Sequence, residues 1–364
     1  MTQRPKDLVP IVFALPGKLT DMTGGTLYDR HLTDALRDLG HSVEILELSG
    51  AFPEPDAESL AQAMEQFASV PPEAILIVDG LAFGALPADG RRRIASRIVA
   101  MLHHPLGLEP GRPAVRAQAL IQSERAALDC AAHILVPSPH VARTVQELFA
   151  ISETRISIAR PGIAPIAGTE TRAALSPAIP PLILSVGLLH RRKGHDILLS
   201  ALSQITDIDW QAKIIGRDHD PDEAARLRAR AREGDLADRG TLAGEVSAEA
   251  VSNEYQRATL FALATRYEGY GLVFDEALTH GLPIVSCQAG AVPDTVPADA
   301  GILVPPDNPE AFAKALREVL TQPSLQTRLS QAARSAGRDL PAWRDTAASV
   351  SMILNRLAGE AAAH

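Results

Sequence analysis

One stretch in the last third of the chain alternates strand and helix signals, and it restricts the fold more than any other part. The apolar run from Leu260 to Ala264 fits a buried parallel strand. The segment from Leu272 to Thr279 is expected to be a helix, stopped by Gly281 and Pro283. An apolar run that ends at Ser286 predicts the next strand. Strand, loop, helix and strand in this order predict an α/β fold, with the loop at the carboxyl end of a strand, where parallel sheets bind ligands.

The loop between this strand and this helix carries two glutamates and two glycines, in the sequence R266-Y-E-G-Y-G-L-V-F-D-E276. Gly269 and Gly271 permit a positive φ and let a ligand approach the backbone closely. The helix start turns free backbone N–H groups toward that ligand, which favours an anion. Glu268 lies before the helix and Glu276 about one turn inside it, so both can accept hydrogen bonds from hydroxyl groups. A ligand with a phosphate between groups that carry hydroxyls fits this site, and a nucleotide sugar is such a ligand.

The segment from Glu268 to Glu276 resembles the signature of the retaining glycosyltransferases of family 4, in which two glutamates bracket a glycine loop at this spacing. The resemblance implies a GT-B fold, with two Rossmann-like parallel-sheet domains facing a cleft and a terminal helix that crosses back to the first domain. It also implies that Glu268 contacts the donor sugar and Glu276 the ribose hydroxyls. The backbone expected near the diphosphate is that of Gly269, Tyr270, Gly271 and Leu272. Two isolated glutamates are more often merely solvated, and matches elsewhere in the chain favour the binding site.

The length of 364 residues predicts two domains of ordinary size. We expect an acceptor-side Rossmann-like domain at 1–170, a nucleotide-sugar domain at 171–340, and a terminal helix at 341–364 that packs back on the first domain. A stretch rich in Ala and Pro at 164–181 is the expected linker. The apolar stripe of the terminal helix predicts core packing.

Composition excludes several classes of protein. A net charge of −9 and a pI near 5.7 argue against a nucleic-acid binder. No apolar run approaches the ~20 residues of a membrane span, and the first apolar segment is too short for a signal peptide. A cytoplasmic protein is expected, with at most peripheral contact at the inner membrane face.

The cluster Arg91 to Arg93 is expected to be a solvated helix face, or a contact to anionic lipid if the acceptor is a lipid. Cys130 and Cys287 are expected to be small core residues.

The amino-terminal half begins with strand, glycine loop, helix and strand signals over residues 8–48. Neither G-x-G-x-x-G nor a P-loop occurs there, so NAD and ATP motifs do not support those ligands. Gly24 and Gly25 precede the expected helix at 26–39. They serve either as a flexible helix start or, by the resemblance, as a close approach of the backbone to the donor phosphate.

Two histidines follow the predicted strand at 97–102. His103 and His104 would lie at the carboxyl edge of the sheet, where ligands bind. A histidine at a strand end is often structural. The resemblance places one against the donor sugar, and His103 is the first choice and His104 the second.

The second half restarts the pattern, with a basic loop after the strand that begins at Leu182. Lys193, just before Gly194, is suited to bind a diphosphate, although such a cluster before an exposed helix can also be plain surface. The resembled family usually has an arginine where this chain has Leu188. Either Arg191 or Arg192 then supplies the second cation, or the diphosphate is held more weakly.

Three further residues are expected on the nucleotide side. Gly216 and Arg217 end the predicted strand at 212–215, where the resemblance places the base and ribose. Leu242 belongs to the segment 241–246 that the resemblance assigns to the base pocket. In the resembled family this segment binds the base mostly through backbone groups, so these side chains do not predict which base binds.

Together these features predict a hexosyltransferase that uses a nucleoside diphosphate sugar, with UDP-sugar favoured, and retains the anomeric configuration. The acceptor is an unidentified hydroxyl of a small molecule, lipid or glycan. No cofactor and no metal are expected, because fixed amides, Lys193 and an arginine can stabilise the leaving diphosphate. The alternatives are a GT-B nucleotide-sugar epimerase or hydrolase, and a non-catalytic relative that only binds a nucleotide sugar.

Overall fold

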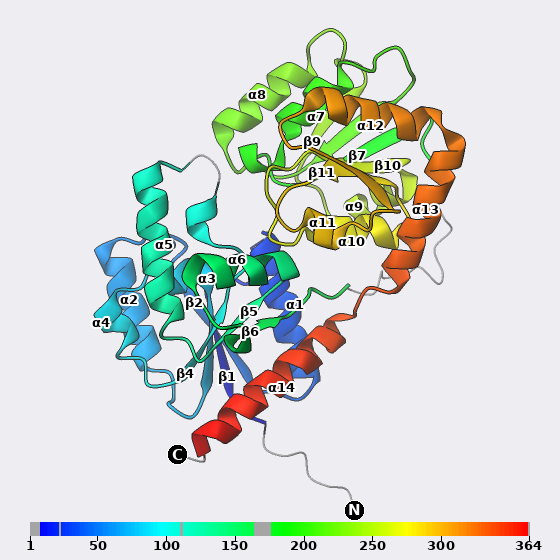
Figure 1. The fold of residues 1–364 in the computed structure, drawn as a ribbon. Coiled ribbons are helices and arrows are strands. Elements are labelled where there is room, and N and C mark those ends of the chain that lie inside the picture. The colour runs from blue at the N-terminus through cyan, green and yellow to red at the C-terminus, as the bar shows by residue number, and fades with distance from the viewer. Residues whose placement is uncertain (1–7, 22, 110–111, 164–175, 363–364) are drawn as a thin grey trace, which may run out of the picture. The chain divides into compact units, whose positions relative to one another are not determined.

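The computed structural model describes residues 8–21, 23–109, 112–163 and 176–362. The chain divides into two compact units (Figure 1). Unit 1 comprises the residues up to 164 and those from 341 onward, and unit 2 comprises residues 165–340. Each unit contains a six-stranded sheet, which confirms the predicted α/β class. The boundary predicted after residue 170 falls outside the described residues, as does most of the predicted linker.

Unit 1 is built on parallel strands in the order β2-β1-β3-β4-β5-β6. The order reverses between β1 and β3, so the loops after these strands diverge at the carboxyl edge, where open α/β sheets bind ligands. The strands are β1 (Ile11–Pro16), β2 (Val43–Leu48), β3 (Ile75–Asp79), β4 (Arg97–Met101), β5 (His133–Val136) and β6 (Ile156–Ile158). The helices are α1 (Gly24–Asp38), α2 (Ala57–Ala68), α3 (Gly80–Phe83), α4 (Ala88–Arg91), α5 (Ala114–Leu128), α6 (Pro139–Phe149) and α14 (Trp343–Ala362), with 3-10 turns η1 (Leu106–Leu108) and η2 (Glu153–Arg155).

The sheet of unit 1 is buried on both faces, which explains the continuous apolar runs of its strands. In β1, Val12 packs in one core cluster and Phe13 in the other, because successive side chains point to opposite faces. The second cluster also holds Trp343 and Leu354 of α14 together with Leu32 of α1. Figure 1 shows α14, in red, running beside α1 within this unit.

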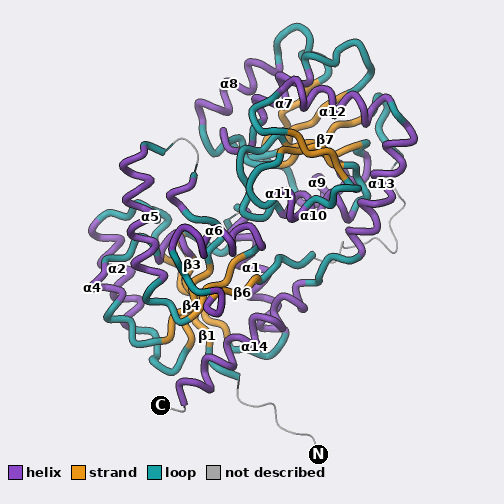
Figure 2. Tube along the Cα trace, viewed as in Figure 1, coloured by secondary structure: helices purple, strands orange, loops and turns teal. Residues whose placement is uncertain are grey.

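Unit 2 repeats the arrangement, with parallel strands in the order β12-β11-β10-β7-β8-β9. Here the order reverses between β7 and β10. Figure 2 shows helices around the strands of both units. The strands are β7 (Leu182–Val186), β8 (Gln211–Ile215), β9 (Gly240–Gly244), β10 (Leu260–Leu263), β11 (Ile284–Cys287) and β12 (Gly301–Val304). The helices are α7 (His195–Leu202), α8 (Pro221–Ala231), α9 (Ala248–Arg257), α10 (Leu272–Thr279), α11 (Val292–Thr295), α12 (Pro309–Thr321) and α13 (Pro323–Arg338), with the 3-10 turn η3 (Arg191–Lys193).

Several local predictions need correction. Helix α1 begins at Gly24, two residues earlier than expected, because the Thr23 side chain accepts a hydrogen bond from the Thr26 N–H and caps the helix there. Arg91 is not solvated: its guanidinium is buried and donates to the Leu86 carbonyl. Cys130 is exposed, whereas Cys287 is buried as predicted. Within the described ranges, no helix combines the length and apolar composition that a membrane span requires.

Candidate functional site

The loops that leave β7 and β10 meet at the switch point of the second sheet and bring two predicted residues into contact. Lys193, after β7, places Nζ 2.6 Å from Oε1 of Glu268, after β10. Both side chains are nearly buried, with 12% of Lys193 and 6% of Glu268 exposed. The sequence placed both residues on loops of one domain, and the structure joins them in an ion pair.

Two further groups hold the Glu268 carboxylate. The Thr265 hydroxyl donates to Oε1 at 3.0 Å, and Arg192 Nη1 lies 3.6 Å from Oε2. Burial alone would raise the pKa of Glu268, but Lys193 and Arg192 outweigh burial and hold this pKa below its usual value. The carboxylate is therefore ionised. One carboxylate beside two cations leaves the cluster net positive, which suits an anionic ligand.

Two glycines let the surrounding backbone pack against this pair. Gly194 has a φ of +66°, and a Cβ there would lie 1.9 Å from the carbonyl oxygen of Ala264. Gly290 has a φ of +56°, and a Cβ there would lie 2.3 Å from the carbonyl oxygen of Glu268. That same carbonyl accepts a hydrogen bond from the Ala291 N–H at 2.8 Å. A side chain at either glycine would push its loop away from the motif.

The start of α10, predicted as an anion site, has no side-chain cap. Gly271 is the N-cap residue, with a φ of +92°. The position of a Cβ on Gly271 is filled by the Phe274 ring at 2.6 Å, so this glycine serves the fold as well as any ligand. Leu272 is the first helical residue and is half-buried. An uncapped helix start presents backbone N–H groups that an anion can bind.

The other motif residues differ in exposure. Tyr270 is buried, and its hydroxyl donates to the Asp275 carboxylate, so this side chain supports the loop from inside. Gly269 is half-buried, and Glu276 is exposed one turn into α10. The exposed carboxylate of Glu276 is accessible to a ligand, and its contact with a ribose stays a prediction.

The structure distinguishes the two arginines that could replace the arginine missing at Leu188. Arg192 is half-buried, and its Nη1 donates to the Tyr267 carbonyl at 3.1 Å as well as approaching Glu268. Arg191 is exposed, and its carbonyl accepts a hydrogen bond from Arg266. The geometry therefore favours Arg192 as the second cation.

The residues predicted on the nucleotide side lie at β8 and β9. The Gly216 N–H donates to the Gly244 carbonyl at 2.9 Å, and a Cβ on Gly216 would lie 1.9 Å from the carbonyl oxygen of Gly187. Close backbone packing between protein loops thus already requires this glycine. Arg217 is half-buried just after β8, and the Leu242 side chain packs partly against the core from β9. Binding of base or ribose by these residues stays a prediction.

In unit 1, His103 contacts two aspartates that the sequence analysis did not identify. Its Nε2 lies 3.1 Å from Oδ1 of Asp29, in α1, and 3.4 Å from Oδ2 of Asp79, at the end of β3. Both aspartates are buried. Burial disfavours the charged imidazole, but Asp29 and Asp79 outweigh it and raise the pKa of His103 to about 10. Burial in turn raises the pKa of Asp29 to about 6.

The remaining predicted residues of unit 1 lie near the same edge of the sheet. A Cβ on Gly25 would lie 3.3 Å from the His103 ring, so the glycine lets this ring rest against the start of α1. A Cβ on Gly24 would meet no atom within 4 Å. His104 belongs to another cluster, with Nε2 3.2 Å from Glu109, which also pairs with Arg112. The structure thus joins His103 to Gly25 and gives His104 different partners.

Within the described ranges, Asp29, Asp79 and His103 form the group that could hold a metal ion, since one ligand atom from each lies within 4.8 Å of the others. Carboxylate oxygen and imidazole nitrogen both bind divalent metals. In unit 2, Asp218 and Asp220 have Asp-x-Asp spacing. Asp218 pairs with Arg228 at 2.7 Å, and the Asp220 side chain caps α8. The expectation that no metal is needed stays a prediction.

Four residues of these clusters were not predicted from the sequence, and only two of them could have been recognised by their place in the hydrophobic pattern. Asp79 ends an otherwise apolar strand, and Asp29 interrupts the buried face of α1. A charged residue where the pattern predicts burial is a usable signal. Thr265 and Gly290 carried no such signal, because their importance comes from contacts across the sheet edge.

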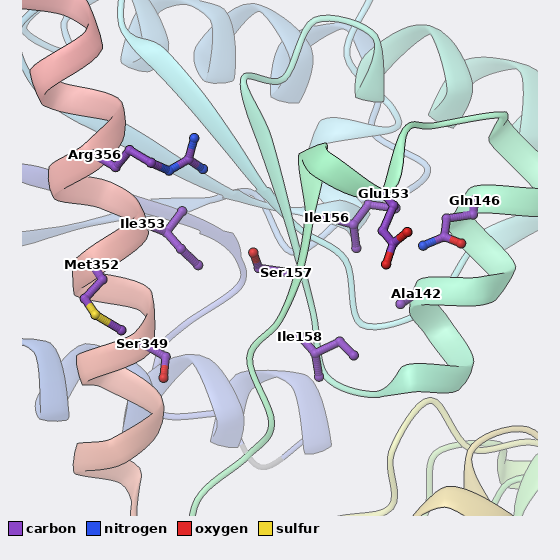
Figure 3. Close-up of a pocket in the computed structure, with 10 residues that line it drawn as sticks. All are labelled: Ala142, Gln146, Glu153, Ile156, Ser157, Ile158, Ser349, Met352, Ile353 and Arg356. Carbon is purple, nitrogen blue, oxygen red and sulfur yellow. The ribbon is translucent and has the colours of Figure 1, made fainter.

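A groove of about 560 Å³ in unit 1 lies between β6, α6 and α14 (Figure 3). Ile156 and Ile158 of β6 and Met352 and Ile353 of α14 line it, with Arg356 at one end. None of the residues predicted to bind the donor lines this groove. Its mixed apolar and charged lining matches no step of the predicted chemistry.

A model of a known protein family matches most of the second half of the chain. Residues 169–336 match the family model described as glycosyl transferases group 1. This range contains Lys193, Glu268 and Glu276.

Sequence relatives agree with this family. A D-inositol 3-phosphate glycosyltransferase from Xylanimonas cellulosilytica is 28% identical over 222 residues, which cover 57% of this chain and 53% of that protein. A mannosylfructose-phosphate synthase from Agrobacterium fabrum is 25% identical over 170 residues, covering 44% of this chain and 37% of that protein. The chain spans about half the length, or less, of these curated relatives.

Solved structures extend the fold assignment to both units. A sucrose-phosphate synthase from Thermosynechococcus elongatus has a TM-score of 0.82 at 23% identity, covering 96% of this chain and 99% of that one. HepE of Anabaena, solved in complex with UDP-glucose, has a TM-score of 0.75 at 14% identity, covering 95% and 99%. The chain therefore has the GT-B fold predicted for it, and its residues 169–336 match the family model of the group 1 glycosyl transferases.

Proposed function

We propose that this protein is a retaining glycosyltransferase that moves a hexose from a nucleoside diphosphate sugar to the hydroxyl group of an acceptor, without a metal or other cofactor. The observation that carries the proposal is the contact between Lys193 and Glu268 at the switch point of the second sheet. This contact lies between the η3 turn and the loop that leads into the start of α10, which has no side-chain cap, so cations, a carboxylate and a helix N-terminus lie close together.

The charges of this cluster suit departure of a nucleoside diphosphate. Breaking the bond from the anomeric carbon to the diphosphate oxygen builds negative charge on the diphosphate and positive charge on the sugar. Lys193, Arg192 and the amides at the start of α10 would stabilise the first, because they are fixed before the reaction begins. Stabilisation by these groups can replace a divalent metal at the diphosphate.

Glu268 and Glu276 would act on the two ends of the donor. We assign Glu268 to the sugar hydroxyls and the anomeric centre, and Glu276 to the ribose hydroxyls. The sugar is expected to keep its anomeric configuration because the acceptor hydroxyl attacks from the face that the diphosphate leaves, with the leaving phosphate accepting its proton. His103, held by Asp29 and Asp79, is the residue of unit 1 that we assign to the donor sugar, with Gly24 and Gly25 beside the donor phosphate.

UDP is the favoured nucleotide of the donor. HepE, which shares the fold, was solved with UDP-glucose, and the pneumococcal transferase GtfA, also similar in fold, was solved with UDP and GlcNAc. The curated relatives described above are named for glycosyl transfer or for synthesis of a sugar phosphate, which favours transfer over epimerisation. The acceptor is a small molecule, lipid or glycan. We expect a cytoplasmic reaction, at the inner membrane face if the acceptor is a lipid.

The proposal is tested by incubating the purified protein with UDP-, GDP- and ADP-sugars and a panel of hydroxyl acceptors in EDTA. Released nucleoside diphosphate and glycoside would be measured by mass spectrometry, and the anomeric configuration by NMR, with E268Q as the inactive control. Glycoside with the donor's configuration supports the proposal. Free sugar or an isomer from donor alone would support a hydrolase or epimerase, and donor binding without turnover of any acceptor would support a non-catalytic relative.

A further inference from the structure

Arg266, the first residue of the motif loop, contacts three separate segments of unit 2. Its guanidinium donates to both carboxylate oxygens of Asp196, in the first turn of α7, at 2.9 and 2.7 Å. Its Nε donates to Asp307, after β12, at 2.7 Å, and its Nη1 donates to the carbonyl of Arg191 at 2.5 Å. Only 12% of its side chain is exposed. The planar fork of an arginine can bridge several acceptors at once, and a lysine cannot.

The backbone beside Arg266 holds the same loop. The Arg266 N–H donates to the Arg192 carbonyl at 2.8 Å. The Thr265 hydroxyl lies 3.1 Å from that carbonyl, which competes with Glu268 for its single hydrogen. Residues 265–266 therefore bind the two residues that precede Lys193 through the backbone and through side chains. The position of the Lys193 ammonium depends on these contacts, because it extends from the loop that they fix.

The charge of Arg266 is already neutralised. Burial would raise the pKa of Asp196, but Arg266 outweighs burial and lowers it, so this carboxylate stays ionised against the guanidinium. Asp307 has a φ of +56°, a left-handed conformation that aspartate tolerates better than most residues, and its carboxylate meets Nε of Arg266. With two aspartates bound, Arg266 differs from Arg192, which pairs with the site carboxylate Glu268 itself.

We propose that Arg266 is a positioning residue of the donor site: it fixes the loop 191–193 so that Lys193 is held ready for the donor diphosphate. The inference rests on the proposed function, since it assigns Arg266 a role through Lys193 and no direct contact with the ligand. It explains why an arginine whose charge is paired with two aspartates of the same unit stands two residues before Glu268.

The test compares R266M and R266K with the matched control R317M. Arg317 of α12 lies in the same unit and binds one aspartate, Asp207, through two hydrogen bonds of 2.7 and 2.6 Å. It also donates to the Gln204 carbonyl at 3.3 Å, and neither Asp207 nor Gln204 is a predicted site residue. R266M should lose roughly 10- to 100-fold in kcat/KM for the donor, as misplaced catalytic groups do. R317M should match the wild type, and R266K should fall between, because lysine can keep one of the contacts.

A double variant separates positioning from a general structural effect. If Arg266 acts through Lys193, adding R266M to K193M should change kcat/KM by less than about threefold, because coupled residues are not additive. Activities are measured at a temperature where circular dichroism shows every variant folded, and D307N replaces R266M if that variant does not fold.

Two outcomes would overturn the inference in an active enzyme: R266M equal to R317M, or a full further loss when R266M is added to K193M. A wild-type protein that binds and turns over no nucleotide sugar would instead refute the proposed function.

Discussion

Replacing Lys193 by methionine should destabilise unit 2 strongly, because it leaves the Glu268 carboxylate buried without its closest cation. The ammonium lies 2.6 Å from this carboxylate, whereas Arg192 lies 3.6 Å away. Removing one partner of a buried ion pair typically costs about 3–5 kcal/mol. Because Arg192 and Thr265 remain, we expect a loss of about 3 kcal/mol in the free energy of unfolding. The double variant K193M/E268Q should recover most of this loss, since it removes the buried carboxylate, and Arg192 is 20% exposed to water and keeps its hydrogen bond to the Tyr267 carbonyl.

A half-exposed pair in the same unit provides the control. Lys213 lies 2.8 Å from Glu254, with 30% and 14% of these side chains exposed. Because water can solvate both groups when the pair is broken, K213M should cost about 1 kcal/mol or less.

The assay uses the two tryptophans of the chain, Trp210 in unit 2 and Trp343 in unit 1. In a W343F background, urea unfolding at pH 7 followed by fluorescence reports unit 2 through the buried Trp210 alone. Equal stability of K193M and the parent, or a double variant no more stable than K193M, would refute the account of this ion pair.

Three further predictions concern the same unit. G216A should lower the free energy of unfolding by roughly 1–3 kcal/mol, because its Cβ would lie 1.9 Å from a backbone carbonyl oxygen. The control G234A should be nearly neutral, because a Cβ there meets no atom within 4 Å, and urea unfolding measures both variants. Burial lowers the pKa of His195 from 6.5 to about 4. As the pH falls from 6.5 to 4, this histidine becomes protonated in the unfolded chain before it does so in the folded protein, so the free energy of unfolding should fall by roughly 3 kcal/mol. The stability difference between wild type and H195Q should shrink over that range, and a constant difference would contradict the assigned pKa. E276A should weaken donor binding by roughly tenfold in calorimetry, since hydrogen bonds from the ribose hydroxyls to the carboxyl group are lost, and unchanged affinity would remove Glu276 from the site.

The elements around the site could be predicted because their signals are local. Helix α10 has the predicted bounds, Leu272–Thr279. Its apolar face favours a helix packed on the core, and Gly281 and Pro283 end it. The strand β10, Leu260–Leu263, was likewise predicted from a short apolar run. The helix α13 was not predicted, although Pro323 marks its first turn, because its sequence has few large apolar residues.

The contacts of the site could not be predicted, because they depend on strand order. Lys193 and Glu268 are 75 residues apart and meet only because β10 pairs with β7. Periodicity assigns a residue to a strand or helix, and it does not say which strands are neighbours. The same holds for His103, whose partners come from α1 and β3. The sequence could predict which side chains lie at the ends of strands. Which of these side chains contact one another depends on the order of the strands in the sheet.

Binding of nucleotide sugars in EDTA tests the central claim most directly. Thermal unfolding of the W343F protein, followed through Trp210, would be recorded with UDP-, GDP- and ADP-sugars. A ligand at a hundredfold excess over its dissociation constant adds about 2.7 kcal/mol to the folded state, which corresponds to roughly 5–11 °C for a unit of this size. A metal-independent rise of that order with a UDP-sugar, diminished in E276A, is the predicted result. No rise with any nucleotide sugar would contradict the assignment of unit 2 as a donor-binding unit.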